Sequence, residues 1–178
     1  MIGSIVAKRY ALALFQIANE KQLLDQMELE LRTVREVTLN NADFKALLNS
    51  PKISKENKKQ MIKTIFAGIS EDVQNTIIIL MERSRGQEIP GVATHFIELA
   101  NEAKGTADAI VYSARPLSET EANSISTTFA ASIGKKSLQM NNIVDETLIG
   151  GVKVQIGNRI YDGTLRNKLS RLERKLLG

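Results

Sequence analysis

The chain has 178 residues, of which 43% are hydrophobic and 25% charged, a composition ordinary for a globular protein of one large or two small domains. It contains no cysteine, which excludes a disulfide framework, a thiolate metal site and a cysteine nucleophile. The net charge is +4, and the last fifteen residues alone supply it, with five basic side chains against one acidic. No apolar run approaches the roughly 20 residues that a membrane-spanning helix needs, and no signal peptide is indicated.

The first part of the chain is patterned as helices. Apolar residues recur at spacings of three and four, and Ser54 and Ser70 stand where helix N-caps are expected. We predict a bundle of six helices and no strand in residues 1–104, with helices at about 4–19, 22–40, 42–49, 54–67, 70–84 and 90–104.

Two of these helices carry more apolar surface than one core contact requires. The apolar arc of residues 4–19 covers roughly 200°, whereas a surface helix needs a stripe of a little over 100°. Three adjacent isoleucines at 77–79 leave another helix apolar nearly all round. Either these helices are buried on two sides within their own domain, or part of their surface binds a partner.

Composition changes near residue 105, so we predict a second domain over residues 105–178. A strand is expected at 109–114, and Ser118 with Glu121 forms a capping box that opens a helix ending near Gly134. The last helix carries leucines at spacings of four, three and four: Leu165, Leu169, Leu172 and Leu176. The predicted fold class is therefore α+β, a six-helix bundle followed by a small α/β domain with a short sheet and a carboxyl-terminal helix.

The most strongly patterned stretch lies around Gly150-Gly151. Ile143-Val144 precedes this pair, and Val152 to Ile156 follows it with the alternation of a half-buried strand. A glycine pair before a strand indicates a bulge or a close approach of another backbone, because glycine lacks a Cβ. Gly157 begins a hairpin turn into a partner strand at 159–162.

No group of residues indicates catalysis, a cofactor or a metal. Gly134-Lys135-Lys136-Ser137 lacks the earlier glycine of a phosphate loop, and His95 with Glu98 and Glu102 is best interpreted as a surface histidine beside solvated acids. Asp145 and Glu146, if on a strand, would point to opposite faces. The lysine-rich run at 52–63 is expected to be a solvated face. The sequence favours a binding or structural protein over an enzyme.

Residues 138–157 resemble the signature of the delta subunit family of the F-type ATP synthase, known in mitochondria as the oligomycin sensitivity conferral protein. The matching residues include Asp145, Gly150, Gly151 and Gly157, together with Leu138, Met140, Val144, Leu148, Val152, Val154 and Gln155. The sequence continues as family members do at residues 161–165, and residues 6–15 resemble the family's first helix. The resemblance covers the whole chain and is to bacterial members.

The resemblance implies a non-catalytic stator subunit, present in one copy and without cofactor. It would link the top of the alpha3beta3 hexamer to the stalk formed by the b-subunit dimer, at the cytoplasmic face of the cell membrane, which it would meet only through the complex. The helical domain would bind the amino-terminal helix of an alpha subunit in a groove, and the surplus apolar residues are the candidates: Tyr10, Ala13, Leu14, Ile17, Ile78 and Ile79. The second domain would face the stalk, with Leu169, Leu172 and Leu176 as candidates.

The alternative is a basic nucleic-acid-binding helical protein. Its two basic segments lie in different predicted domains, and 4% aromatic residues offer little for base stacking. No nucleic-acid partner is therefore expected.

Overall fold

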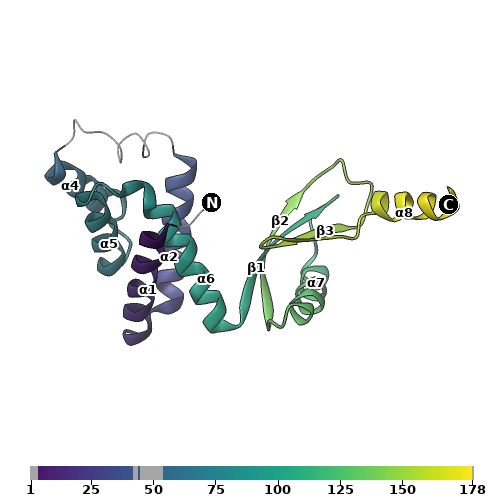
Figure 1. The fold of residues 1–178 in the computed structure, drawn as a ribbon, viewed down its shortest axis with the longest axis horizontal. Helices are drawn as coiled ribbons and strands as arrows, with labels where there is room; N and C mark the ends of the chain where they lie inside the picture. Colours follow the sequence, from purple (N-terminus) through teal and green to yellow (C-terminus); the bar gives the residue numbers. More distant parts are fainter. Residues whose placement is uncertain (1–3, 42–43, 45–53, 178) are drawn as a thin grey trace. The chain divides into compact units, whose positions relative to one another are not determined.

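The computed structural model describes residues 4–41, 44 and 54–177. The chain forms two compact units, Met1–Ala100 and Asn101–Gly178, called here the helical unit and the sheet unit (Figure 1). The division falls before the end of the last helix of the first unit, because that helix's final turn is bonded to the following strand. The Asn101 side chain donates to Asp108 at 3.2 Å and accepts from Thr106 at 3.0 Å.

The described part of the helical unit contains five α-helices and one short 3₁₀ helix. The predicted helix at 42–49 lies outside the described residues except for Phe44, so the six-helix bundle stays a prediction. The helices are α1 (Ile5–Glu20), α2 (Leu24–Asn40), α4 (Lys55–Ile65), α5 (Glu71–Glu82), η1 (Gly86–Glu88) and α6 (Ile89–Lys104), the last of which crosses into the sheet unit.

Small side chains let the helices of this unit approach closely. The buried stripe of α1 contains three alanines and Leu14, and Gly91 of α6 stands where a Cβ would lie 3.1 Å from the Cβ of Ala7. Phe15 meets Phe96 edge-on, with ring centroids 6.1 Å apart. Ser54 caps α4 as predicted, whereas Ser70 makes no cap bond. Its hydroxyl donates instead to Glu30 at 2.6 Å, which ties α5 to α2.

The sheet unit is a four-stranded mixed sheet with order β2-β1-β3-β4. β1 is parallel to β2, a pairing that needs a crossover and has one in α7, and antiparallel to β3, which forms a hairpin with β4. The predicted α+β class is confirmed. The elements are β1 (Thr106–Ser113), α7 (Glu119–Ser132), β2 (Ser137–Val144), β3 (Val152–Ile156), β4 (Arg159–Asp162) and α8 (Leu165–Leu177).

The strands on either side of the glycine pair are not neighbours in this sheet. Ile143-Val144 and Val152 to Ile156, which flank the pair in the sequence, both lie in strands, but β1 lies between these strands and pairs with both. The first strand is also longer, from Ser137, because polar residues at 139, 141 and 142 hide its alternation. The strand order depends on pairing between residues far apart in the chain, and a local pattern of apolar residues does not reveal that pairing.

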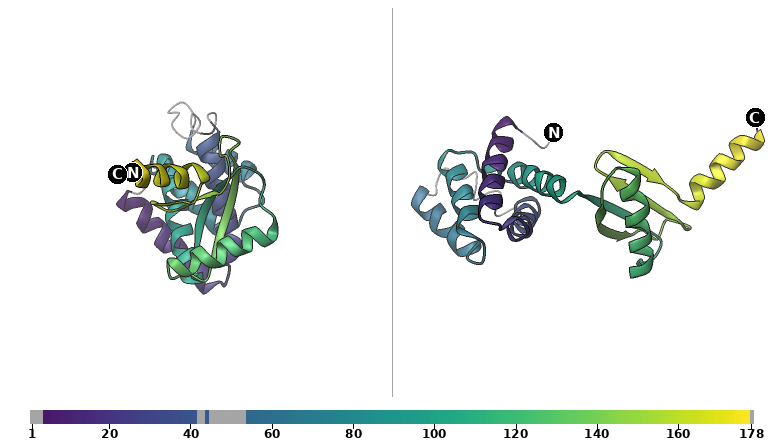
Figure 2. Two further views of the ribbon diagram at one scale, coloured as in Figure 1. Left: turned by 90° about the vertical axis from the view of Figure 1, so that its right-hand side faces the viewer. Right: turned by 90° about the horizontal axis from the view of Figure 1, so that it is seen from below.

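One face of the sheet packs against α7 (Figure 1; Figure 2). The core between them contains Val111 and Val154, both fully buried, and Phe129 of α7 meets Tyr161 of β4 at 5.2 Å between ring centroids. The capping box at the start of α7 is confirmed. Arg115 donates to Glu121, and this bond together with those from Ser118 lowers the pKa of Glu121 to about 2.

Candidate partner-binding surfaces

Among the described residues, no group of three or more histidine or acidic side chains could hold a metal ion. His95 is not the surface residue that we predicted. Its side chain is 12% exposed, its Nδ1 lies 2.8 Å from Glu98, and its Nε2 is buried without a hydrogen-bond partner among the described atoms. No helix within the described ranges is long and apolar enough to span a membrane.

Two aspartates of the signature stretch and its continuation build turns. Asp145 lies in a turn after β2, not on a strand as considered from the sequence, and accepts from the backbone and hydroxyl of Thr147 at 3.0 and 2.6 Å. Asp162 accepts in the same way from Thr164, at 3.0 and 2.7 Å. These bonds favour the charged form and lower the pKa of both carboxyl groups. Both carboxylates therefore stabilise local turns of the backbone.

The glycine pair lies against the turn that leads into α8. Gly151 has φ +80°, and a Cβ added to it would lie 2.5 Å from the carbonyl oxygen of Gly163. The amide of Leu165 donates to Gly150 at 3.0 Å, and that of Gly163 donates to Val152 at 3.0 Å. The close backbone approach that the sequence predicted is thus confirmed. We call Gly150, Gly151 and residues 162–165 the β4–α8 junction; it fixes where α8 begins.

The leucine stripe of α8 is exposed along its whole length. The exposed fractions of Leu165, Leu169, Leu172 and Leu176 are 43%, 59%, 56% and 85%. An isolated helix of 13 residues is only marginally stable in water, and apolar side chains at this spacing suit a facing helix. The three predicted stalk residues, Leu169, Leu172 and Leu176, therefore lie on a surface that can take a partner.

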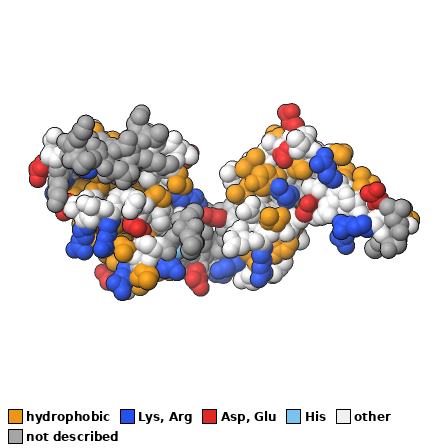
Figure 3. All heavy atoms as spheres, turned by 45° about the horizontal axis from the view of Figure 1, so that its top comes forward, with side chains coloured by type: hydrophobic (Ala, Val, Ile, Leu, Met, Phe, Trp, Pro, Cys, Tyr) orange, Lys and Arg blue, Asp and Glu red, His pale blue; other side chains and the backbone are white. Residues whose placement is uncertain are grey.

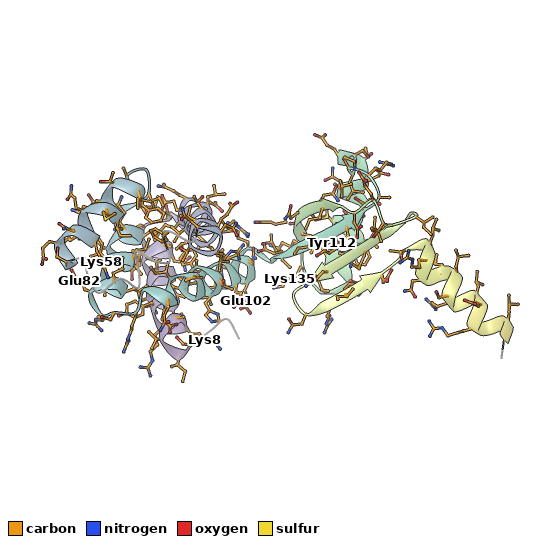
Figure 4. The ribbon with its side chains drawn as sticks, turned by 90° about the horizontal axis from the view of Figure 1, so that it is seen from above. Lys8, Lys58, Glu82, Glu102, Tyr112 and Lys135 are labelled. Carbon is orange, nitrogen blue, oxygen red and sulfur yellow. The ribbon has the colours of Figure 1, made fainter. Side chains whose placement is uncertain are left out.

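The six predicted groove residues divide into two groups. Leu14 and Ile78 are 1% and 5% exposed and belong to the core of the helical unit, so neither presents a free surface. Ile78 lines a cleft with Lys58, Lys59, Met81 and Glu82, of which Lys58 and Glu82 are marked in Figure 4. Part of the surplus apolar surface of α5 is thus covered by α4. This is the first alternative left open by the sequence, burial on two sides within the same domain.

The remaining groove residues lie at the surface, with Ile79 of α5 40% exposed. On α1, Ala13 is exposed, and Tyr10 and Ile17 are partly buried. These three lie within about 60° of one another around the helix, so they form one stripe. α1 and α5 are packed against each other in the helical unit. Sequence reasoning missed Ile5 and Leu12 on α1, which are 72% and 49% exposed.

Together, these observations define a two-unit α+β protein with exposed apolar side chains on helices of both units. The family model of the ATP synthase delta (OSCP) subunit matches residues 6–176. The ATP synthase subunit delta of Geobacillus sp. (strain WCH70) is 55% identical over 178 residues, which cover 100% of both chains. The subunit delta of Anoxybacillus flavithermus (strain DSM 21510 / WK1) is 51% identical over 99% of both chains.

A chain in the cryo-EM structure of the Toxoplasma gondii mitochondrial ATP synthase hexamer has the same fold, with a TM-score of 0.68 and 21% identity, covering 98% of this chain and 99% of that one. The chain therefore belongs to the ATP synthase delta (OSCP) subunit family. In this family the subunit is a structural part of the ATP synthase stator and not a catalytic one. The nucleic-acid alternative finds no support in these relatives.

Proposed function

We propose that the two units bind different parts of the ATP synthase. The helical unit binds the alpha3beta3 hexamer through the amino-terminal helix of an alpha subunit, and the sheet unit binds the b-subunit stalk dimer. One copy of the chain in each complex then keeps the hexamer from turning with the rotor, so that proton-driven rotation is coupled to ATP synthesis. The chain meets the membrane only through the complex, at the cytoplasmic face.

The observation that carries the proposal is the exposed leucine stripe of α8, a helix whose first residue is hydrogen-bonded to the β4–α8 junction. The same segment is basic, since residues 164–178 contain five lysine or arginine residues against Glu173 alone. A partner helix with a leucine-type face and acidic flanks would bury the stripe and pair with these charges. The hydrogen bonds of the β4–α8 junction hold the start of α8 in place while load passes through it.

On the helical unit, the proposed groove is smaller than the sequence suggested. Ile79, Ala13 and the partly buried Tyr10 and Ile17 form its surface, and Leu14 and Ile78 support it from the core. An amphipathic helix docks in such a groove through a few apolar anchors. Two attachments on one chain strengthen each other, because once one partner is bound the other binds in an effectively intramolecular step.

Replacing Ile79 by aspartate should weaken binding of a peptide with the alpha subunit's amino-terminal sequence by roughly 50-fold. The change removes apolar contact area and forces a carboxylate to be desolvated in the groove. Ile79 is already 40% exposed, so the helical unit should stay folded. Isothermal titration calorimetry with the full chain measures the affinity.

The matched control is Leu29→Asp on α2, where the side chain is 67% exposed and outside the proposed groove. It should change the affinity by less than about twofold, since it alters neither α1 nor α5. Unchanged affinity of Ile79→Asp, with its circular dichroism spectrum preserved, would show that the peptide binds elsewhere.

A further inference from the structure

Helices α1 and α5, which border the proposed groove, are joined at one end by charged side chains. Lys21, the C-cap residue of α1, donates to both carboxylate oxygens of Asp72 in the first turn of α5, at 2.9 and 2.7 Å. Ser70, the N-cap residue of α5, donates to Glu30 of α2 at 2.6 Å. The start of α5 is therefore bonded to two neighbouring helices.

The opposite end of α1 is joined to the segment that follows α5. The hydroxyl of Ser4, the N-cap residue of α1, donates to the carboxylate of Glu88 in η1. The same hydroxyl accepts from the Ala7 amide at 3.1 Å, so it also caps α1. Since the end of α1 meets the start of α5, and the start of α1 meets the segment after α5, the two helices run antiparallel. We call the pairs Lys21–Asp72 and Ser4–Glu88 the end contacts.

The surface residues of the proposed groove lie between the end contacts. They are Tyr10, Ala13 and Ile17 on α1 and Ile79 on α5. Ala13 precedes Lys21 by eight residues and Ile79 follows Asp72 by seven, so at about 1.5 Å per residue they lie about 12 Å and about 10 Å from the same end contact. This contact therefore brings Ala13 and Ile79 level with each other along the groove. On the face drawn in Figure 3, apolar side chains of the helical unit lie at the surface with charged side chains beside them.

Apolar packing alone is a poor determinant of how far one helix slides along another. The hydrophobic contribution follows the buried area and has no direction. The buried stripe of α1 consists largely of alanines, whose short side chains form low ridges for a neighbouring helix to interlock with. Hydrogen bonds and ion pairs hold two particular atoms together at a defined distance. The end contacts are interactions of the kind that specify the register of α1 and α5.

On the basis of the proposed groove for the alpha subunit's amino-terminal helix, we propose that Ser4, Lys21, Asp72 and Glu88 are positioning residues of that groove. They hold α1 and α5 at one register and separation before the partner binds. A groove that is already in its binding geometry spares the complex the cost of ordering it. Loss of the end contacts therefore lowers the affinity, although none of the four residues is an apolar anchor.

The test uses the double variant Lys21→Met with Glu88→Ala in the full chain. Both substitutions spare the caps of α1, because residue 21 caps the helix through its backbone amide and Ser4 keeps its bond to Ala7. Binding of a peptide with the alpha subunit's amino-terminal sequence, measured by calorimetry, should weaken about fivefold, in keeping with the modest strength of exposed ion pairs.

A second readout follows the two helices without any partner. The chain contains no cysteine, so spin labels attached at Gln16→Cys and Asn75→Cys, which are exposed positions of α1 and α5, report the separation of these helices alone. Electron paramagnetic resonance should give a distance distribution that is roughly twofold broader in the double variant, because helices without directional contacts sample more arrangements.

Two further variants separate the end contacts from charge and stability. Lys21→Arg with Glu88→Gln keeps a cation for Asp72 and an acceptor for the Ser4 hydroxyl, and should behave as the unaltered chain in both measurements. Lys8→Met with Glu36→Ala is the matched control, since it removes one basic and one acidic side chain at exposed positions outside the end contacts. It should change neither measurement.

An unchanged distance distribution in the Lys21→Met and Glu88→Ala variant would overturn the inference, because apolar packing would then hold the helices unaided. An equal loss of affinity in the control would overturn it too, by assigning the effect to overall charge. If Ile79→Asp weakens peptide binding and the end-contact variant does not, the groove stands and the positioning role is wrong. If neither variant weakens binding, the groove assignment is wrong as well.

Discussion

Replacing Gly151 by alanine is expected to destabilise the β4–α8 junction by about 2 to 4 kcal/mol. A side chain at φ +80° is strained by about 1 to 2 kcal/mol. The added Cβ would also lie 2.5 Å from the carbonyl oxygen of Gly163 and 3.0 Å from the Cα of Thr164. Both are backbone atoms, so the strand or the turn must move. Hydrogen exchange of the Gly163 and Leu165 amides, measured by NMR, should accelerate roughly 100-fold.

The control is Gly157→Ala in the β3–β4 hairpin. Gly157 has φ +55°, also in the left-handed region, but no described atom lies within 4 Å of the position that its new methyl group would take. The Gly157→Ala variant therefore has the backbone strain without the clash, and its folded state should be destabilised by about 1 kcal/mol. Equal exchange rates at the Gly163 and Leu165 amides in the two variants would show that the close approach at Gly151 does not hold the junction.

Replacing Leu169 and Leu172 by alanine is expected to weaken binding of the b-subunit dimer about 50-fold. Full burial of a leucine contributes about 1.5 to 3 kcal/mol. Since these two are 59% and 56% exposed in the free chain, a partner can bury roughly half of each, which amounts to about 1.5 to 3 kcal/mol together. Alanine is the best helix former, so α8 should remain helical. Titration calorimetry with the full chain measures the loss.

Ser170→Ala is the matched control, because residue 170 lies between the two leucines and outside the stripe. It should leave the affinity unchanged within about twofold. Binding to the alpha3beta3 hexamer provides a second readout, and it should not change in the leucine variant. A simultaneous loss of both affinities would indicate that the substitutions unfold the chain and do not remove a contact.

Local chemistry allowed most elements to be predicted from the sequence. The Ser118 and Glu121 capping box, the leucine spacing of α8 and the hairpin at Gly157 are interactions between residues close in the chain, and each occurs in the structure. Ser70 shows where this reasoning fails. Its cap position was correct, but a carboxylate from another helix, Glu30, competes for its hydroxyl, and only the tertiary fold brings the two together.

The candidate site was predictable only in part, for the same reason. Helical periodicity showed that α5 has apolar residues on more than one side, but it could not say which side another helix covers. Ile78 is buried in the core of the helical unit, whereas Ile79 is exposed.

The kind of contact made by the glycine pair was predicted correctly, since the sequence predicted a close backbone approach and the structure contains one. The approaching segment, residues 162–165, could not be named from periodicity. It pairs with the glycines because β4 returns beside β3 and ends at this point. The signature stretch and the start of the basic last helix, which are separate features of the sequence, are therefore joined at this junction.

The most direct test of the stator assignment is reconstitution of coupling. Membranes carrying the complex but stripped of this subunit should lose ATP-driven proton pumping, measured by quenching of a pH-sensitive dye. Adding the intact chain should restore pumping, whereas adding the Leu169→Ala and Leu172→Ala variant at the same concentration should restore little, although the hexamer still hydrolyses ATP. If stripped membranes pump equally well without the chain, it is not required to hold the hexamer against the rotor, and the stator assignment is contradicted.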